Sequence, residues 1–281
     1  MKWLRCRHGG AEKFGVLDAG QVRLHSGDLF NAPTPTGECI AVADIDWLTP
    51  CQPGKIIGLW NNFRAAAEKH GWAQPAEPLY FLKASSSALA HDGVIPAPLG
   101  DLGQGVGRVA YEGELAIVIG RRARRVAVVD AAAHILGYSC ANDVTALELL
   151  HRDPSFAQWA RAKSFDGFGA FGPVIETDFD VVNATLRTLV GGRERQNYPL
   201  ADMFFSPHEL VSRLSFDMTL APGDVILCGT SLGVLPMKPG TVVEVVIDGI
   251  GALRNTFAPP LQAPLAKSGL APSPARGRRL G

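Results

Sequence analysis

Short apolar runs separated by turns containing Pro and Gly dominate the chain up to about residue 260. Several runs have strand length and are rich in β-branched residues: KIIGLW (55–60), ELAIVIG (114–120), DVILCG (224–229) and TVVEVVI (241–247). Helical periodicity is best at residues 61–71 and 144–163. The pattern predicts a mostly β fold with a few helices, arranged as a mixed β-sandwich or roll. It argues against a doubly wound parallel sheet, because such sheets alternate strands with helices.

Changes in composition predict three regions. Residues 1–55 alternate short apolar runs with turns, which predicts a small β-rich N-terminal domain ending near TPCQPGK (49–55). Residues 56–260 carry most of the apolar runs and should form the main domain. Residues 261–281 are rich in Pro, Ala, Gly and Ser and lack apolar periodicity, so we expect a disordered tail.

Charge and cysteine content narrow the function classes. The chain has 27 basic and 27 acidic residues, so its formal net charge is zero and it lacks the basic excess of a nucleic-acid binder. We also expect no membrane segment and no signal peptide, because no apolar stretch is long enough for either. The five cysteines are scattered without C-x-x-C spacing, which favours reduced thiols in a cytoplasmic protein.

Two acids stand at the start of one apolar run, RVAYEGELAIVIG (108–120). In a continuous strand, Glu112 and Glu114 would share a face, with Cα atoms roughly 7 Å apart. Two solvated acids at an exposed strand end are the simpler interpretation. The alternative is that the two acids share a cation. Buried like charges must either take up a proton or bind a cation between them. Asp143 offers a third carboxylate suited to Mg²⁺ or Mn²⁺, although a helix N-cap is the commoner role for such a residue.

Four segments together carry a resemblance to the fumarylacetoacetate hydrolase family: YEGEL (111–115), GYSCANDVTA (137–146), RAKSFDGFGAFGPVI (161–175) and LSFDMTLAPGDVILCGTSLGV (214–234). They occur in the family's order between about residues 56 and 257. The N-terminal region resembles the branch of bacterial 2-hydroxyhepta-2,4-diene-1,7-dioate isomerases and related hydrolases.

The resemblance implies the family's β-sandwich roll, a homodimer and a site in residues 56–260. Glu112, Glu114 and Asp143 would hold Mg²⁺ or Mn²⁺, and Lys163 would approach the substrate beside the metal. Three further residues would bind substrate: Thr230, Gln196 and Lys83. Without the resemblance, Lys163 is more simply a surface lysine, Thr230 a turn residue and Gln196 part of an exposed turn.

Such a site implies hydrolysis of a C–C bond in a small, acylpyruvate-like 2-oxo acid. The metal and Lys163 would stabilise the enolate that forms. Decarboxylation and enol–keto isomerisation pass through the same enolate and remain alternatives. A metal-binding relative without activity is a third hypothesis, disfavoured because a silent site has no physical reason to keep buried like charges.

The chain departs from the family pattern at two places. Hydrolytic members carry a lid helix with a His held by a Glu, which activates water. Here Glu68 matches the Glu, but the His position falls on Ala65, or on Arg64 if the gap is placed differently. An Arg64–Glu68 pair would be an ordinary ion pair within a helix. Members that cleave fumarylacetoacetate carry Arg and Gln where this chain has Leu147 and Leu150. We therefore expect a substrate other than fumarylacetoacetate. Efficient hydrolysis would need a water-activating base at another position, and His151 is the first candidate.

Overall fold

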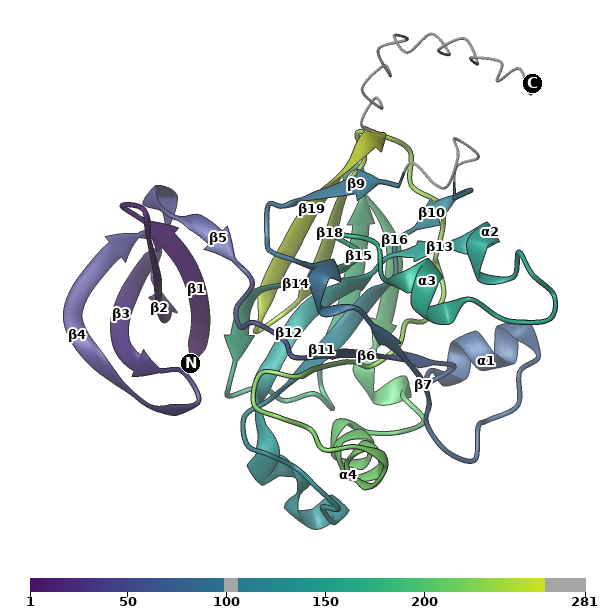
Figure 1. Cartoon of the computed structure of the whole chain (residues 1–281), viewed down its shortest axis with the longest axis horizontal. Helices are drawn as coiled ribbons and strands as arrows, with labels where there is room; N and C mark the ends of the chain where they lie inside the picture. Colours follow the sequence, from purple (N-terminus) through teal and green to yellow (C-terminus); the bar gives the residue numbers. More distant parts are fainter. Residues whose placement is uncertain (99–105, 261–281) are drawn as a thin grey trace, which may run out of the picture.

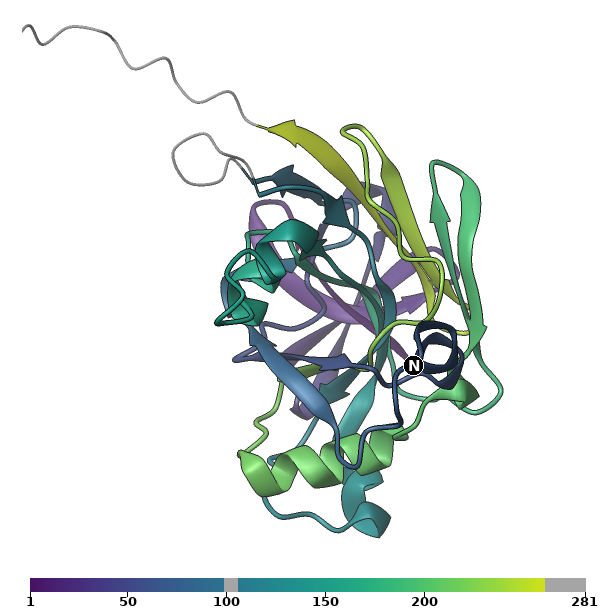
Figure 2. The ribbon, with the colours of Figure 1, turned by 90° about the vertical axis from the view of Figure 1, so that its right-hand side faces the viewer.

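Two packed β-sheets build the chain, as the apolar pattern predicts (Figures 1 and 2). The computed structural model describes residues 1–98 and 106–260, so the predicted disordered tail lies outside the described residues. Within the described ranges, twelve strands form the larger sheet, in the order β4-β3-β2-β1-β14-β12-β11-β17-β6-β7, with β5 paired to β1 and β8 to β14. The second sheet has the order β16-β15-β18-β19-β9, and β10 pairs separately with β13.

The strands of the larger sheet are β1 (Lys2–His8), β2 (Ala11–Asp18), β3 (Gln21–Asp28), β4 (Asn31–Ala41), β5 (Asp46–Leu48), β6 (Ile56–Trp60), β7 (Leu79–Lys83), β8 (Ala88–Leu89), β11 (Gly113–Ile119), β12 (Ile135–Asp143), β14 (Gly169–Glu176) and β17 (Val225–Leu227). Those of the second sheet are β9 (Val94–Ala97), β15 (Thr185–Val190), β16 (Arg193–Pro199), β18 (Val242–Ile247) and β19 (Gly251–Pro260). The short pair is β10 (Val109–Ala110) and β13 (Thr145–Ala146).

Strand β11 lies near the middle of the larger sheet and is buried on both faces. Leu115 and Ile117 pack into the cluster that also holds Leu186 and Val245 of the second sheet. Ala116 and Val118 pack into a different cluster on the opposite face. A continuous apolar run such as LAIVI (115–119) is what a strand covered on both faces requires, and it anchors the acids that lie at its start.

The first four strands form an antiparallel meander that stands apart in Figure 1. Their edge strand β1 pairs with β14 of the main body, through Lys2↔Glu176 and Trp3↔Ile175. The predicted β-rich N-terminal region is therefore part of the same hydrogen-bonded sheet as the centre of the fold.

The helices are fewer and shorter than the strands. They are α1 (Arg64–His70), α2 (Leu147–Leu150), α3 (Trp159–Lys163) and α4 (Pro207–Asp217). Figure 1 shows α1, α2 and α3 on the side opposite the N-terminal meander. None of the described helices is long and apolar enough to cross a membrane.

Two helix expectations need correction. The predicted helix over 144–163 is interrupted, because Pro154 disfavours helix at Asp153, and the Asp153 carboxylate instead accepts hydrogen bonds from the N–H and hydroxyl of Ser155. Helix α4 was not predicted, although its signal is present. Ser206 and Glu209 form a capping box around Pro207 at the first helical turn.

Candidate functional site

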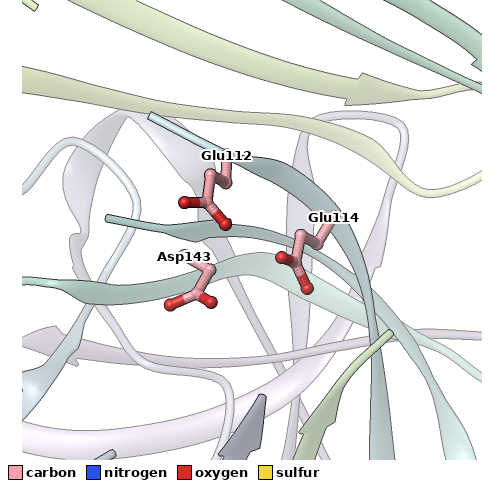
Figure 3. A group of neighbouring side chains, drawn as sticks. All are labelled: Glu112, Glu114 and Asp143. Atoms are coloured by element: carbon pink, nitrogen blue, oxygen red, sulfur yellow. The ribbon is translucent and has the colours of Figure 1, made fainter. Parts of the chain in front are cut away.

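Three carboxylates meet where β11 begins and β12 ends. Glu112 precedes β11, Glu114 lies within it, and Asp143 is the last residue of β12. One carboxylate oxygen from each lies within 4.8 Å of the others, and Figure 3 shows the three side chains next to one another. Glu114 and Asp143 are fully buried, whereas the side chain of Glu112 is 16% exposed. The site therefore reaches the surface on the side of Glu112.

The backbone around Glu112 differs from the predicted single strand over 108–120. Pairing stops after Ala110 and resumes at Gly113, so Tyr111 and Glu112 form a break between β10 and β11. The Asn142 side chain accepts from the Glu112 N–H at 3.0 Å, and the Asp143 N–H donates to the Glu112 carbonyl at 2.8 Å. These two bonds hold Glu112 beside Asp143, and the break explains how two acids of one segment converge on a third.

Two buried lysines bind the carboxylates. The ammonium of Lys163 lies 2.6 Å from Asp143 Oδ2 and 2.9 Å from Glu112 Oε2. The ammonium of Lys83 lies 2.5 Å from Asp143 Oδ1, and the side chains of both partners are fully buried. Lys163 is thus placed beside the three acids. Lys83, which we expected to bind substrate, lies behind Asp143 with no exposed surface and supports that carboxylate.

Burial and charge shift the ionisation of this cluster in different directions. Burial, reinforced by the charges of Asp143 and Glu112, raises the pKa of Glu114 well above its usual range. Burial alone would also raise the pKa of Asp143, but Lys163 and Lys83 together lower it. Burial would lower the pKa of Lys163, and the three carboxylates outweigh it and raise that pKa. For Lys83, burial prevails and lowers the pKa despite the contact with Asp143.

The donor set fits a hard divalent cation. Glu114 Oε2 accepts a hydrogen bond from the Gly229 N–H at 2.7 Å, whereas Glu114 Oε1 is buried without a partner in the described structure. Gly229 has a φ of +89°, a conformation that favours glycine and turns its N–H toward the acid. An unpartnered buried carboxylate oxygen facing two other carboxylates is a natural ligand for Mg²⁺ or Mn²⁺.

The predicted substrate-binding residues Thr230 and Gln196 lie together beside the acids. The Thr230 hydroxyl donates to the Gly113 carbonyl at 2.9 Å and accepts from the Gln196 amide at 2.8 Å. The carbonyl oxygen of Gln196 accepts from the Gly113 N–H at 3.0 Å. Gln196 is almost completely buried. Its contacts therefore brace the loop after β17 against the start of β11.

Helix α1 places the predicted lid residues on the surface. Glu68 is exposed, and within the described chain its carboxylate has no hydrogen-bond or ion-pair partner. Arg64 does not pair with it: its guanidinium bonds to the Met203 carbonyl and lies 5.1 Å from the centre of the Phe204 ring. The Ala65 N–H is bound by the Asp202 carboxylate at 2.9 Å. In this conformation Glu68 does not join the cluster.

Sequence reasoning missed residues that lie next to those it selected. Thr145 donates its hydroxyl to Glu112 Oε1 at 2.6 Å, and Asn142 holds the Glu112 backbone. Both belong to the segment that carries Asp143, so their proximity to it was an available signal. The contact between Gly229 and Glu114 had no such signal, because it joins residues 115 positions apart.

Comparison with known proteins identifies the family. Residues 55–258 match the model of the fumarylacetoacetate (FAA) hydrolase C-terminal domain, and residues 1–50 match that of the Rv2993c-like N-terminal domain. The chain belongs to the fumarylacetoacetate hydrolase family, as its motifs indicated.

Several relatives and solved structures are similar over most of the chain. Protein Rv2993c of Mycobacterium tuberculosis is 38% identical over 229 residues, covering 80% of this chain and 83% of that protein. The 4-hydroxyphenylacetate degradation bifunctional isomerase/decarboxylase of Salmonella dublin is 37% identical over 205 residues, covering 72% of this chain and 46% of that protein. The structure of the 2-hydroxyhepta-2,4-diene-1,7-dioate isomerase from Mycobacterium marinum has a TM-score of 0.82 and 33% identity, covering 92% of this chain and 98% of that one.

Proposed function

We propose that this chain is a divalent-metal-dependent enzyme that converts a small 2-oxo acid or its 2-hydroxydienoate enol, by isomerisation or decarboxylation. The observation that carries the proposal is the buried cluster of Glu112, Glu114 and Asp143 with the ammonium of Lys163 beside it. The names of the similar enzymes from Salmonella dublin and Mycobacterium marinum support the same reaction classes.

The three carboxylates would hold Mg²⁺ or Mn²⁺, which supplies Lewis-acid chemistry to the oxygens of a 2-oxo acid. Lys163 stays protonated, because the surrounding acids raise its pKa. Its ammonium therefore adds a fixed positive charge where an enolate oxygen would develop. The braced loop of Thr230 offers backbone groups next to the same place, which suits the orientation of a carboxylate.

Hydrolytic C–C cleavage of an acylpyruvate is the second candidate, supported by the family's name and by the same enolate. That reaction needs a base within reach of a water molecule. In the described structure Glu68 is exposed, Ala65 stands where the lid histidine was expected, and the ring of His70 stacks on Trp72 at 4.5 Å between centroids. Isomerisation and decarboxylation depend less on such a base, so we place them first.

The test is a set of three assays with Mg²⁺: ketonisation of a 2-hydroxy-2,4-dienoate, decarboxylation of oxaloacetate and cleavage of acetylpyruvate. We expect one or both of the first two to exceed the third. Lys163→Met should lower all of them, because each passes through an enolate. Lys13, a partly exposed residue of β2 in the N-terminal meander, provides the matched control Lys13→Met. Efficient acetylpyruvate cleavage without the other two activities would contradict the proposed order.

A further inference from the structure

A row of aromatic rings begins at Lys163. The Lys163 ammonium lies 5.0 Å from the centre of the Phe81 ring, and Trp159 stacks on Phe81 with centroids 5.3 Å apart and planes at 18°. Trp60 meets Trp159 edge-on at 6.2 Å, and Trp72 lies 4.9 Å from Trp60. We call these four rings (Phe81, Trp159, Trp60 and Trp72) the aromatic row.

The row is tied to the carboxylate site through one helix. Trp159 and Lys163 are four residues apart on α3, so they share one face of that helix. Phe81 contacts both of them from β7. The same face of α3 therefore presents a buried ammonium at one end and an indole ring at the other, about one helical turn away.

Exposure increases along the row away from Lys163. Phe81 is buried, Trp159 and Trp60 are partly exposed, and Trp72 is 40% exposed. Three indoles thus lie in successive contact between the buried Phe81 and the exposed end at Trp72, beside a charged site.

We propose that the aromatic row binds the non-reacting end of the substrate, and that this end is an apolar group, aromatic or alkyl. The inference rests on the proposed function, which places the 2-oxo acid end at Glu112, Glu114, Asp143 and Lys163. On this proposal, a molecule anchored there extends along the rings toward Trp72. Offset stacking and edge contacts with indoles favour a phenyl or alkyl chain.

A second carboxylate at that end would be a poor fit. It would lose water of hydration against the rings, whose faces carry the negative side of the π quadrupole. Arg161, the basic residue between Trp159 and Lys163, lies two positions from each and so lies off the face that they share. His70 stacks on Trp72 at the exposed end of the row, whereas the rings between Trp72 and Lys163 contact one another. Along these rings the structure favours an apolar substituent over the carboxylate of a dicarboxylic acid.

Binding of three saturated 2-oxo acids tests the inference independently of turnover. The compounds are 2-oxohexanoate, 2-oxoheptanedioate and 2-oxo-6-phenylhexanoate, which differ only at the sixth carbon. Calorimetry with the Mg²⁺-loaded protein should show the phenyl compound binding about tenfold or more tightly than 2-oxohexanoate, as for one apolar group in a fitted pocket. The dicarboxylate should bind no more tightly than 2-oxohexanoate.

Two variants locate the effect. Trp159→Ala should reduce the preference for the phenyl compound to about threefold or less, and Trp159→Phe should restore most of it. Tyr80→Ala is the matched control, because Tyr80 neighbours Phe81 on β7 but bonds to Asp217 and is exposed. It should keep the full preference. If Trp159→Ala does not fold, Trp72→Ala at the exposed end should lower the preference instead.

The outcomes separate the two proposals. Equal binding of the phenyl and unsubstituted compounds, or tighter binding of the dicarboxylate, overturns the aromatic row as a binding site even if the enzyme is active. The predicted preference together with no conversion of any 2-hydroxydienoate or oxaloacetate overturns the reaction and leaves the binding inference standing. Absence of binding by all three compounds overturns both.

Discussion

Replacing Lys83 by Met removes one of the two ammonium groups that bind Asp143. The Lys83–Asp143 distance is 2.5 Å, and neither side chain has exposed surface. Met fills most of the volume of the lysine stem, so the change removes a charge and its hydrogen bonds while creating little cavity. Asp143 keeps its contact with Lys163 at 2.6 Å.

The magnitude follows from that geometry. Removing one partner of a buried ion pair costs about 3–5 kcal/mol, because the other charge stays desolvated. Since Lys163 still compensates Asp143, we expect the lower end, about 3 kcal/mol. At about 2–4 °C per kcal/mol for chains of this size class, the melting temperature should fall by about 6–12 °C.

The assay is thermal unfolding followed by circular dichroism in a chelator, so that bound metal does not contribute. Lys13→Met is the control: its partner Glu38 is 3.9 Å away and both side chains are partly exposed, so the loss should stay below about 1 kcal/mol. In an Asp143→Asn background, Lys83→Met should cost much less, since the charge it compensates is gone. A variant as stable as wild type would refute the reasoning, because the ion pair would then only offset its own desolvation.

Three smaller predictions concern α1 and α4. Ala65→His should raise acetylpyruvate cleavage about tenfold or more relative to decarboxylation, since a base three residues from Glu68 can activate water; unchanged selectivity in steady-state assays would point to a base elsewhere, with His151 first. Ser206→Ala should cost about 1 kcal/mol in urea unfolding, because it removes the cap of α4. Hydrogen bonds from Ser206 lower the pKa of Glu209. The contribution of the ionised Glu209 to folding stability is therefore complete above the unfolded-state pKa of about 4.3. It is lost as pH falls through the folded-state pKa. In urea unfolding, Glu209→Gln should therefore destabilise the protein at neutral pH but not in strong acid.

Local pattern predicted the main elements well, because it reports burial directly. The run LAIVI (115–119) is apolar at every position, and the structure buries the corresponding strand on both faces. The strands at 56–60, 225–227 and 242–247 were predicted for the same reason. Fold class was thus accessible from strand length and the scarcity of helical periodicity.

The errors arose where side chains compete with the pattern. The periodicity of 144–163 suggested one helix, but the Asp153–Ser155 turn before α3 breaks it. Conversely, α4 was overlooked since its apolar face is short, and only the capping box at Ser206 marks it.

In the site, too, the sequence predicted local features but not those that depend on tertiary contacts. Three acids could be selected from spacing and resemblance, and the structure brings them within 4.8 Å. The different places of the two lysines could not be predicted from the sequence. Lys83 and Lys163 are distant in the chain, and each binds a different oxygen of Asp143. The break at Tyr111–Glu112 was also hidden, since it depends on the tertiary contact with Asn142. The predicted homodimer stays a prediction.

The central claim is that Glu112, Glu114 and Asp143 form the metal site, and a Mn²⁺ titration tests it most directly. Free Mn²⁺ is measured by electron paramagnetic resonance as the ion is added to metal-stripped wild type and to Glu114→Gln. This substitution keeps the shape of the side chain and can keep the Gly229 hydrogen bond, while removing one charged ligand. The account predicts about one tight ion per wild-type chain and at least about tenfold weaker binding by the variant. Equal affinity and stoichiometry in the two proteins would contradict it.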